Sequence, residues 1–156
     1  MISSFKSENG MSTGLEWDEH YRLGITSIDD QHKHLFDIVA HIAALDAATS
    51  TKEDLRQILG ELSTYMSEHF KDEEKYMEQI RFPSYEYHMR LHHDIIEFVN
   101  SSVSQAPTLA MIQTKLKFII KKALIDHILV EDMKIKLFMM QKKEIMEEGI
   151  IDLESV

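Results

Sequence analysis

Apolar residues recur every three or four positions along four stretches of this chain, and this periodicity restricts the possible folds more than any other feature. An α-helix has 3.6 residues per turn, so each stretch would present one apolar side that must be buried. We predict helices over about 29–47, about 52–80, from just after Ser84 to about 103, and from about 109 with a helical tail to about 148. Four amphipathic helices joined by short loops favour an all-α, antiparallel up-down-up-down four-helix bundle.

Residues that start or stop helices lie between these stretches. Ser50 or Thr51 could cap the second helix, and Pro83 and Pro107 interrupt the chain before the third and the fourth. Gly149 is expected to end the helical tail. Gly and Pro together number only seven, five Gly and two Pro, so the sequence contains few points at which a long helix would break.

The chain before the first helix lacks helical periodicity. Residues 1–14 are rich in Ser and Gly and are predicted to be a flexible leader. Residues 15–29 are predicted to form an extended arm without a helix, packed across the bundle. One folded domain is therefore expected over 15–148, with a short tail over 149–156. The length of 156 residues suits a single domain with a continuous apolar core.

Charge and composition exclude several classes of function. The formal net charge of -10 opposes binding to nucleic acid or to anionic lipid. No apolar run approaches the roughly 20 residues that span a bilayer. The absence of cysteine excludes a disulfide scaffold, thiolate-bound zinc and Cys-ligated iron–sulfur clusters. We expect a cytoplasmic protein with neither a nucleic-acid nor a membrane partner.

Seven polar side chains fall inside the predicted apolar stripes, where they would point into the bundle. They are His32, His69, Glu73, His88, His92, His127 and Asp132. Residues four apart on a helix lie about 40° apart around its axis and about 6 Å along it. Two pairs have this spacing, one on the second helix and one on the third, so each pair can reach a common centre.

Asp132 does not follow this rule, because it comes five residues after His127. On a regular α-helix that separation is about 140°, which would aim the carboxylate away from the centre. Ile128, Ile135 and Met139 share a stripe with Asp132 that is one residue out of phase with the stripe containing His127. We therefore predict a π-like widened turn or a break between His127 and Asp132.

Chance alone could put one histidine on an apolar face, but it does not explain the whole set. An uncompensated buried carboxylate costs several kcal/mol, against a total stability of roughly 5–15 kcal/mol. Two carboxylates among five inward imidazoles therefore require a cation. The other four histidines serve as controls, because their helical phase or their place in the arm predicts that they face solvent: His20, His34, His41 and His93.

Seven ligands are too many for one tetrahedral zinc, so two metal ions bridged by carboxylates are indicated. Imidazole with carboxylate suits iron, zinc, nickel or copper, and residue type leaves the choice open. The Glu-x-x-His motif of ferritin-like di-iron proteins does not occur in the sequence, nor does the His-Glu-x-x-His of zinc proteases.

The residues around these positions resemble the hemerythrin signature in order and spacing: 28–36, 69–74, His88 with His92, and His127 with Asp132. The resemblance extends over about 15–148. It implies two irons, one held by His88, His92 and His127 and the other by His32 and His69. Glu73, Asp132 and an oxo or hydroxo group would bridge them. It further implies that O2 binds reversibly at the two-histidine iron, as hydroperoxide, for storage, delivery or scavenging.

The resemblance also implies an apolar pocket for oxygen around the ligands, formed by Phe36, Phe70, Leu124 and Ile128. The family usually has Trp four residues before the fourth-helix histidine, whereas this chain has Ala123. The smaller residue would leave a cavity or tunnel near the oxygen site, and we expect faster autoxidation than in an Ala123→Trp variant.

Two other functions stay open at this point. One is an oxygen or redox sensor that signals to a protein partner. The other is a di-iron enzyme acting on peroxide or nitric oxide, although the sequence offers no inward acid or base beyond the ligands. An oxygen-binding protein that is not an enzyme, either a monomer or a weak dimer, is the main expectation.

Overall fold

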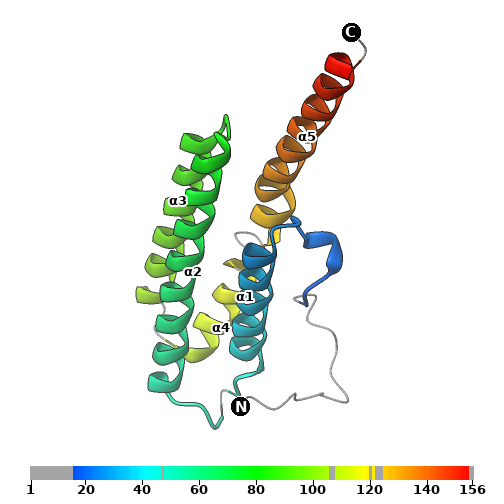
Figure 1. Ribbon diagram of the computed structural model, residues 1–156. Helices are drawn as coiled ribbons and strands as arrows, with labels where there is room; N and C mark the ends of the chain where they lie inside the picture. The colour runs from blue at the N-terminus through cyan, green and yellow to red at the C-terminus, as the bar shows by residue number, and fades with distance from the viewer. Residues whose placement is uncertain (1–15, 47, 106–107, 120, 122–124, 155–156) are drawn as a thin grey trace.

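The computed structural model describes residues 16–46, 48–105, 108–119, 121 and 125–154. Every regular element in these ranges is helical: η1 (Glu19–Tyr21), α1 (Thr26–Ala44), α2 (Lys52–Ile80), α3 (Tyr85–Ser104), α4 (Leu109–Ile119), η3 (His127–Asp132) and α5 (Met133–Glu154). Helix α1 contacts α2, α2 contacts α3, α3 contacts α4, and α4 returns to α1 (Figure 1). This ring of neighbours confirms the predicted four-helix bundle.

Helix α2 carries two of the seven polar side chains and has the predicted bounds. The Thr51 hydroxyl accepts the Asp54 N–H at 3.1 Å, and the Asp54 carboxylate accepts the Thr51 N–H at 2.7 Å. This capping box satisfies two N–H groups that a helix start otherwise leaves unpaired. Arg81, in the left-handed conformation with φ 56, ends the helix.

Helix α1 begins at Thr26, three residues before the predicted start near Asp29. Asp29 does not cap the helix. It lies in the first turn, buried, and its carboxylate accepts the N–H of Leu23 at 2.7 Å and of Gly24 at 3.0 Å. Gly24 has φ 91, which glycine adopts without strain. The carboxylate therefore holds the incoming chain rather than the helix end.

The prediction that the arm contains no helix was also wrong. The arm forms the single 3₁₀ turn η1, which Asp18 caps by accepting the His20 N–H at 2.8 Å. Trp17 and Tyr21 pack edge-on, with ring centroids 5.7 Å apart, and both contact Phe36. The arm therefore packs on α1.

Helix α5 continues past Gly149, the predicted stop, to Glu154. A glycine inside a helix costs only about 1 kcal/mol relative to alanine, which is too little to end a helix without a capping motif. Figure 1 shows α5 extending beyond the ends of α2 and α3. Residues 143–149 are all exposed, so this part of α5 has left the bundle.

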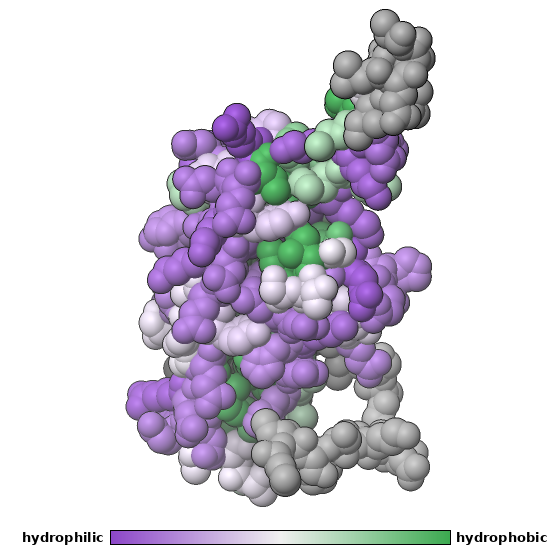
Figure 2. All heavy atoms as spheres, viewed as in Figure 1, coloured by the Kyte–Doolittle hydropathy of each residue, from purple (hydrophilic) through white to green (hydrophobic). Residues whose placement is uncertain are grey.

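The buried apolar residues form two clusters, separated by the polar side chains. The larger cluster joins α1, the first two thirds of α2, and parts of α3 and the fourth-helix region. The smaller one joins Met77, Ile80, Phe82 and Ile135 at the end from which α5 departs. Hydrophilic residues cover most of the face shown in Figure 2, and hydrophobic ones are visible on α5. None of the helices in the described ranges is long and apolar enough to cross a membrane.

Candidate metal centre

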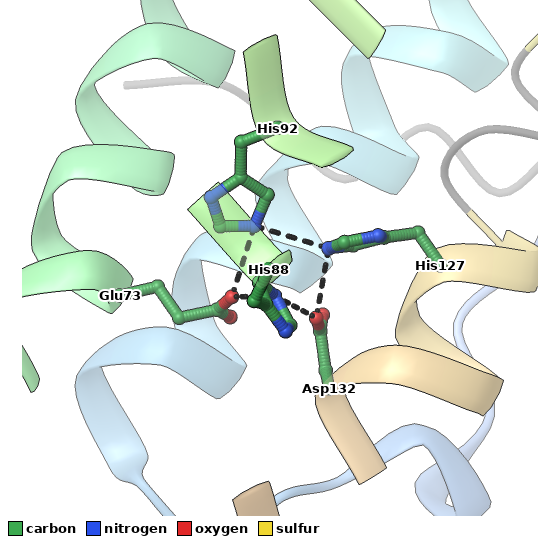
Figure 3. A group of neighbouring side chains, drawn as sticks. All are labelled: Glu73, His88, His92, His127 and Asp132. Atoms are coloured by element: carbon green, nitrogen blue, oxygen red, sulfur yellow. Dashed lines mark hydrogen bonds and ion pairs between the residues drawn. The ribbon is translucent and has the colours of Figure 1, made fainter. Parts of the chain in front are cut away.

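All seven polar side chains predicted to point inward are buried, and they meet in one layer of the bundle. Helix α1 supplies one, α2 and α3 supply two each, and η3 supplies two. Five of the side chains converge on a common point in Figure 3: Glu73, His88, His92, His127 and Asp132. His32 and His69 form a second group with Glu73, so the two groups share one carboxylate.

Local helix geometry explains how each element aims its residues. His69 and Glu73, and likewise His88 and His92, are one helical turn apart and point to the same side. His127 and Asp132 begin and end the π-helical segment η3. A π-helix has a wider turn than an α-helix, so residues five apart come onto one face. The widened turn predicted from the spacing of these two residues is confirmed.

The Glu73 carboxylate lies between the two groups of histidines, with one oxygen toward each. Its Oε1 is 2.9 Å from His88 Nε2 and 3.2 Å from His92 Nε2. Its Oε2 faces the other way, 3.9 Å from His32 Nε2 and 4.0 Å from His69 Nε2. One carboxylate can therefore serve two centres.

Asp132 repeats this division from the opposite side of the layer. Its Oδ1 lies 3.0 Å from His127 Nε2 and 3.1 Å from His88 Nε2. Its Oδ2 lies 3.3 Å from His32 Nε2. The layer thus contains one half with three imidazoles and one half with two, and both carboxylates span the halves.

Unpaired buried atoms test whether this donor set fits metal ions. Among the described residues, the buried side-chain nitrogen and oxygen atoms without a hydrogen bond are His32 Nδ1 and Nε2, Glu73 Oε2, and both Asp132 oxygens. Buried polar atoms without partners are costly. Four of the five belong to the carboxylates or to the His32 nitrogen that faces them, so cations between the halves would satisfy them. Nitrogen and carboxylate donors of this kind suit iron.

The sequence matches one known family over most of this fold. Residues 23–137 match the family described as the Hemerythrin HHE cation binding domain. The chain belongs to the hemerythrin family. It is similar to the bacteriohemerythrin of Campylobacter jejuni, with 31% identity over 109 residues, covering 69% of this chain and 82% of that protein. The bacteriohemerythrin of Stenotrophomonas maltophilia is 25% identical over 118 residues, covering 76% of each chain.

An animal relative matches a shorter region. Hemerythrin subunit 1 of Golfingia vulgaris is 34% identical over 80 residues, covering 51% of this chain and 63% of that protein. Hemerythrins are non-haem di-iron proteins that bind oxygen and are oxygen carriers rather than enzymes. The His, Glu and Asp layer of this hemerythrin can hold such a metal centre.

The electrostatics of the layer follow from burial and from contacts between its members. Burial lowers the pKa of His69 to about 4. Burial opposes charge on His88 too, but the Asp132 and Glu73 carboxylates beside its Nε2 raise its pKa to about 9. Burial also opposes ionisation of Glu73, yet hydrogen bonds from His88 and His92 lower its pKa to about 2. Without metal, a proton on His88 therefore offsets part of the carboxylate charge.

Two polar residues outside the set of seven hold the outer nitrogens of its histidines. His69 Nδ1 lies 2.9 Å from Gln31 Oε1, and His92 Nδ1 lies 2.9 Å from Glu74 Oε1. In both cases Nδ1–H is the donor, because the amide and carboxylate oxygens only accept, and Nε2 is the nitrogen that faces the centre. Sequence reasoning did not assign these roles. The available signal was that each is a polar residue directly beside a predicted ligand.

The predicted oxygen pocket is described only in part. Phe36, Phe70 and Ile128 are buried, and the Phe70 ring stacks on His92 with centroids 3.9 Å apart. Ala123 and Leu124 lie outside the described residues, so the cavity and the autoxidation expected from Ala123 stay predictions.

The four histidines chosen as controls behave as expected. His20, His34, His41 and His93 are all exposed. The contrast is sharpest between neighbours on α3, where the His92 side chain is 2% exposed and that of His93 is 70% exposed. Helical phase separated the inward histidines of the helices from the outward ones.

Proposed function

We propose that this chain holds two iron ions between the seven buried side chains and uses them to bind oxygen reversibly. His88, His92 and His127 would hold one iron, and His32 and His69 the other. Glu73 and Asp132 would bridge, each with a different oxygen toward each half, together with a solvent-derived oxo or hydroxo group. The observation that carries the proposal is the division of both carboxylates between the halves.

A pair of ferrous ions supplies the two electrons that dioxygen takes up and returns. The chain's own residues would determine at which half dioxygen binds and how far water is excluded. Dioxygen would approach the two-histidine half, which offers one imidazole fewer than the other half. The Phe70 ring contacts His69 and His92, Phe36 is buried, and Trp17 lies 6.5 Å from the His32 ring. These rings would limit the entry of water.

We propose a role in storing, delivering or scavenging oxygen in the cytoplasm. No observation favours a sensor or an enzyme acting on peroxide or nitric oxide over this role. A catalytic turnover of either substrate would be evidence against it.

Metal analysis combined with visible spectroscopy tests the proposal. Anaerobically reduced protein should contain two irons per chain and should develop an absorption band under oxygen that disappears when oxygen is removed. His92→Ala should reduce the iron content, whereas the neighbouring variant His93→Ala should leave it at two. At most one metal per chain in the unmodified protein, or a colour change that oxygen removal does not reverse, would contradict the proposal.

A further inference from the structure

The two outer hydrogen bonds of the metal layer end on groups of different charge. His92 Nδ1 faces the Glu74 carboxylate, and His69 Nδ1 faces the Gln31 amide oxygen, each at 2.9 Å. The Gln31 amide nitrogen donates to Asp72 Oδ2 at 2.7 Å, which turns the amide oxygen toward His69. One half of the layer thus has an anionic acceptor and the other a neutral one.

The Glu74 carboxylate is well placed to act on its histidine. Its side chain is 22% exposed and that of His92 is 2% exposed, so solvent screens their interaction only in part. A carboxylate that accepts a hydrogen bond from a metal-binding imidazole makes the opposite nitrogen a better electron donor. A neutral amide orients the ring in the same way but adds no charge.

We propose that Glu74 is a positioning residue that strengthens the hold of the three-histidine half on its iron, while the neutral Gln31 leaves the two-histidine half weaker. This inference rests on the proposed di-iron function. The two halves already differ in their number of imidazoles. The charge behind His92 would be a second cause of a difference in how tightly each half binds its iron. The competing explanation is that Glu74 merely ties α2 to α3 through His92.

A change of charge at constant shape separates the two explanations. Glu74→Gln keeps an oxygen that can accept the His92 Nδ1–H but removes the negative charge. Ferrous iron is titrated anaerobically against a competing chelator, which yields two stepwise dissociation constants. We expect one of them to rise about 10-fold to 100-fold and the other to stay within about threefold.

The reciprocal variant moves the charge to the other half. Gln31→Glu combined with Asp72→Asn keeps the net charge, and an amide at 72 can still donate to a carboxylate at 31. It adds no contact between helices, so a purely structural role predicts no effect. We expect the weaker of the two irons to bind more tightly by about 10-fold or more. This variant also keeps the inference testable if Glu74→Gln fails to fold.

Glu78→Gln is the matched control, because it makes the same substitution at an exposed position one turn further along α2. It should leave both constants unchanged. The inference is overturned if Glu74→Gln, like Glu78→Gln, leaves both dissociation constants unchanged. It is also overturned if the Gln31 and Asp72 exchange leaves the dissociation constant of the weaker iron unaltered. A wild-type chain that binds at most one iron would instead refute the proposed function, before any variant is compared.

Discussion

At the scale of single residues, the His88 imidazole is the group that competes most directly with a metal ion. Burial disfavours its charge, but the Asp132 and Glu73 carboxylates beside its Nε2 raise its pKa to about 9. Metal binding requires the neutral ring, so loading at pH 7.5 must displace this proton. We expect calorimetry with ferrous iron, in two buffers of different ionisation enthalpy, to report at least one proton released per chain.

The same raised pKa gives the metal-free protein a pH dependence of known sign. A histidine whose folded pKa lies above its value of 6.5 in the unfolded chain stabilises the fold fully below pH 6.5. That contribution is lost as the pH rises through about 9. The share of the released protons that comes from His88 should therefore decline as the pH of loading rises through about 9. If iron binding released the same number of protons at pH 7.5 as at pH 10, the carboxylates would not hold His88 protonated.

Two glycines are predicted to respond to alanine in opposite ways. Gly24 has φ 91, so a Cβ there would be strained although no atom lies within 4 Å of it. Gly24→Ala should lower the free energy of unfolding by about 1–2 kcal/mol. Gly60 lies exposed within α2 with the same open space, and Gly60→Ala should raise it by about 0.5–1 kcal/mol. Urea denaturation measures both, and changes of equal sign would contradict the assignment.

At the scale of elements, α5 divides into a part that packs on the bundle and a part that does not. Ile135 is fully buried, Phe138 lies 5.6 Å from the Phe82 ring, and Lys142 donates to the Ile80 carbonyl at 3.3 Å. Beyond Lys142 the described side chains are exposed, including Ile145 at 69%. The stabilising contacts of α5 therefore end at Lys142.

Truncation tests this division directly. A chain ending after Lys142 should keep its iron content and change in unfolding free energy by less than about 0.5 kcal/mol. A chain ending after Lys134 loses Ile135 and Phe138 and should be destabilised by more than about 2 kcal/mol. Thermal unfolding of both truncated chains, each loaded with iron, measures the difference. Equal losses would mean that the exposed part of α5 has an interaction that stabilises the bundle.

The sequence predicted the bounds of an element correctly where a single local rule, such as a capping residue or the spacing of inward residues, determines them. The bounds of α2 follow from the Thr51 cap and the apolar period, and η3 follows from the five-residue interval between His127 and Asp132. Helix α1 begins at Thr26, three residues before the predicted start near Asp29. The partners of the Asp29 carboxylate, the N–H groups of Leu23 and Gly24, depend on the path of the arm, which the periodicity does not encode.

The inward side chains of the candidate centre were predictable from helical phase, whereas the residues behind them were not. Gln31 and Glu74 reach histidines on other helices, 38 and 18 residues away in the chain. Such pairs depend on the rotation and offset of neighbouring helices. Those quantities are set by core packing between helices, not by the pattern within either one.

At the scale of the whole molecule, the metal layer lies between two apolar clusters of unequal size. The large cluster spans α1, α2 and parts of the other helices, whereas the small one contains four buried residues of the described ranges: Met77, Ile80, Phe82 and Ile135. The layer contains five unpaired buried atoms when no cation compensates them. The metal layer separates the small cluster from the large one, so the order of the small cluster should depend on the metals.

Removal of the metals should therefore loosen one end of the molecule before the other. Metals that bind only the folded chain raise its stability by about 1.4 kcal/mol for each tenfold increase in free metal above the dissociation constant. In the metal-free protein, amide hydrogen exchange should accelerate most in η3 and around Met77 and Ile135. It should change least around Leu55 and Leu62, which are buried in the large cluster. Reloading with ferrous iron should restore the slow exchange. A uniform acceleration along all helices would instead mean that the two clusters unfold as one cooperative unit, and that the metals stabilise the bundle without regard to position.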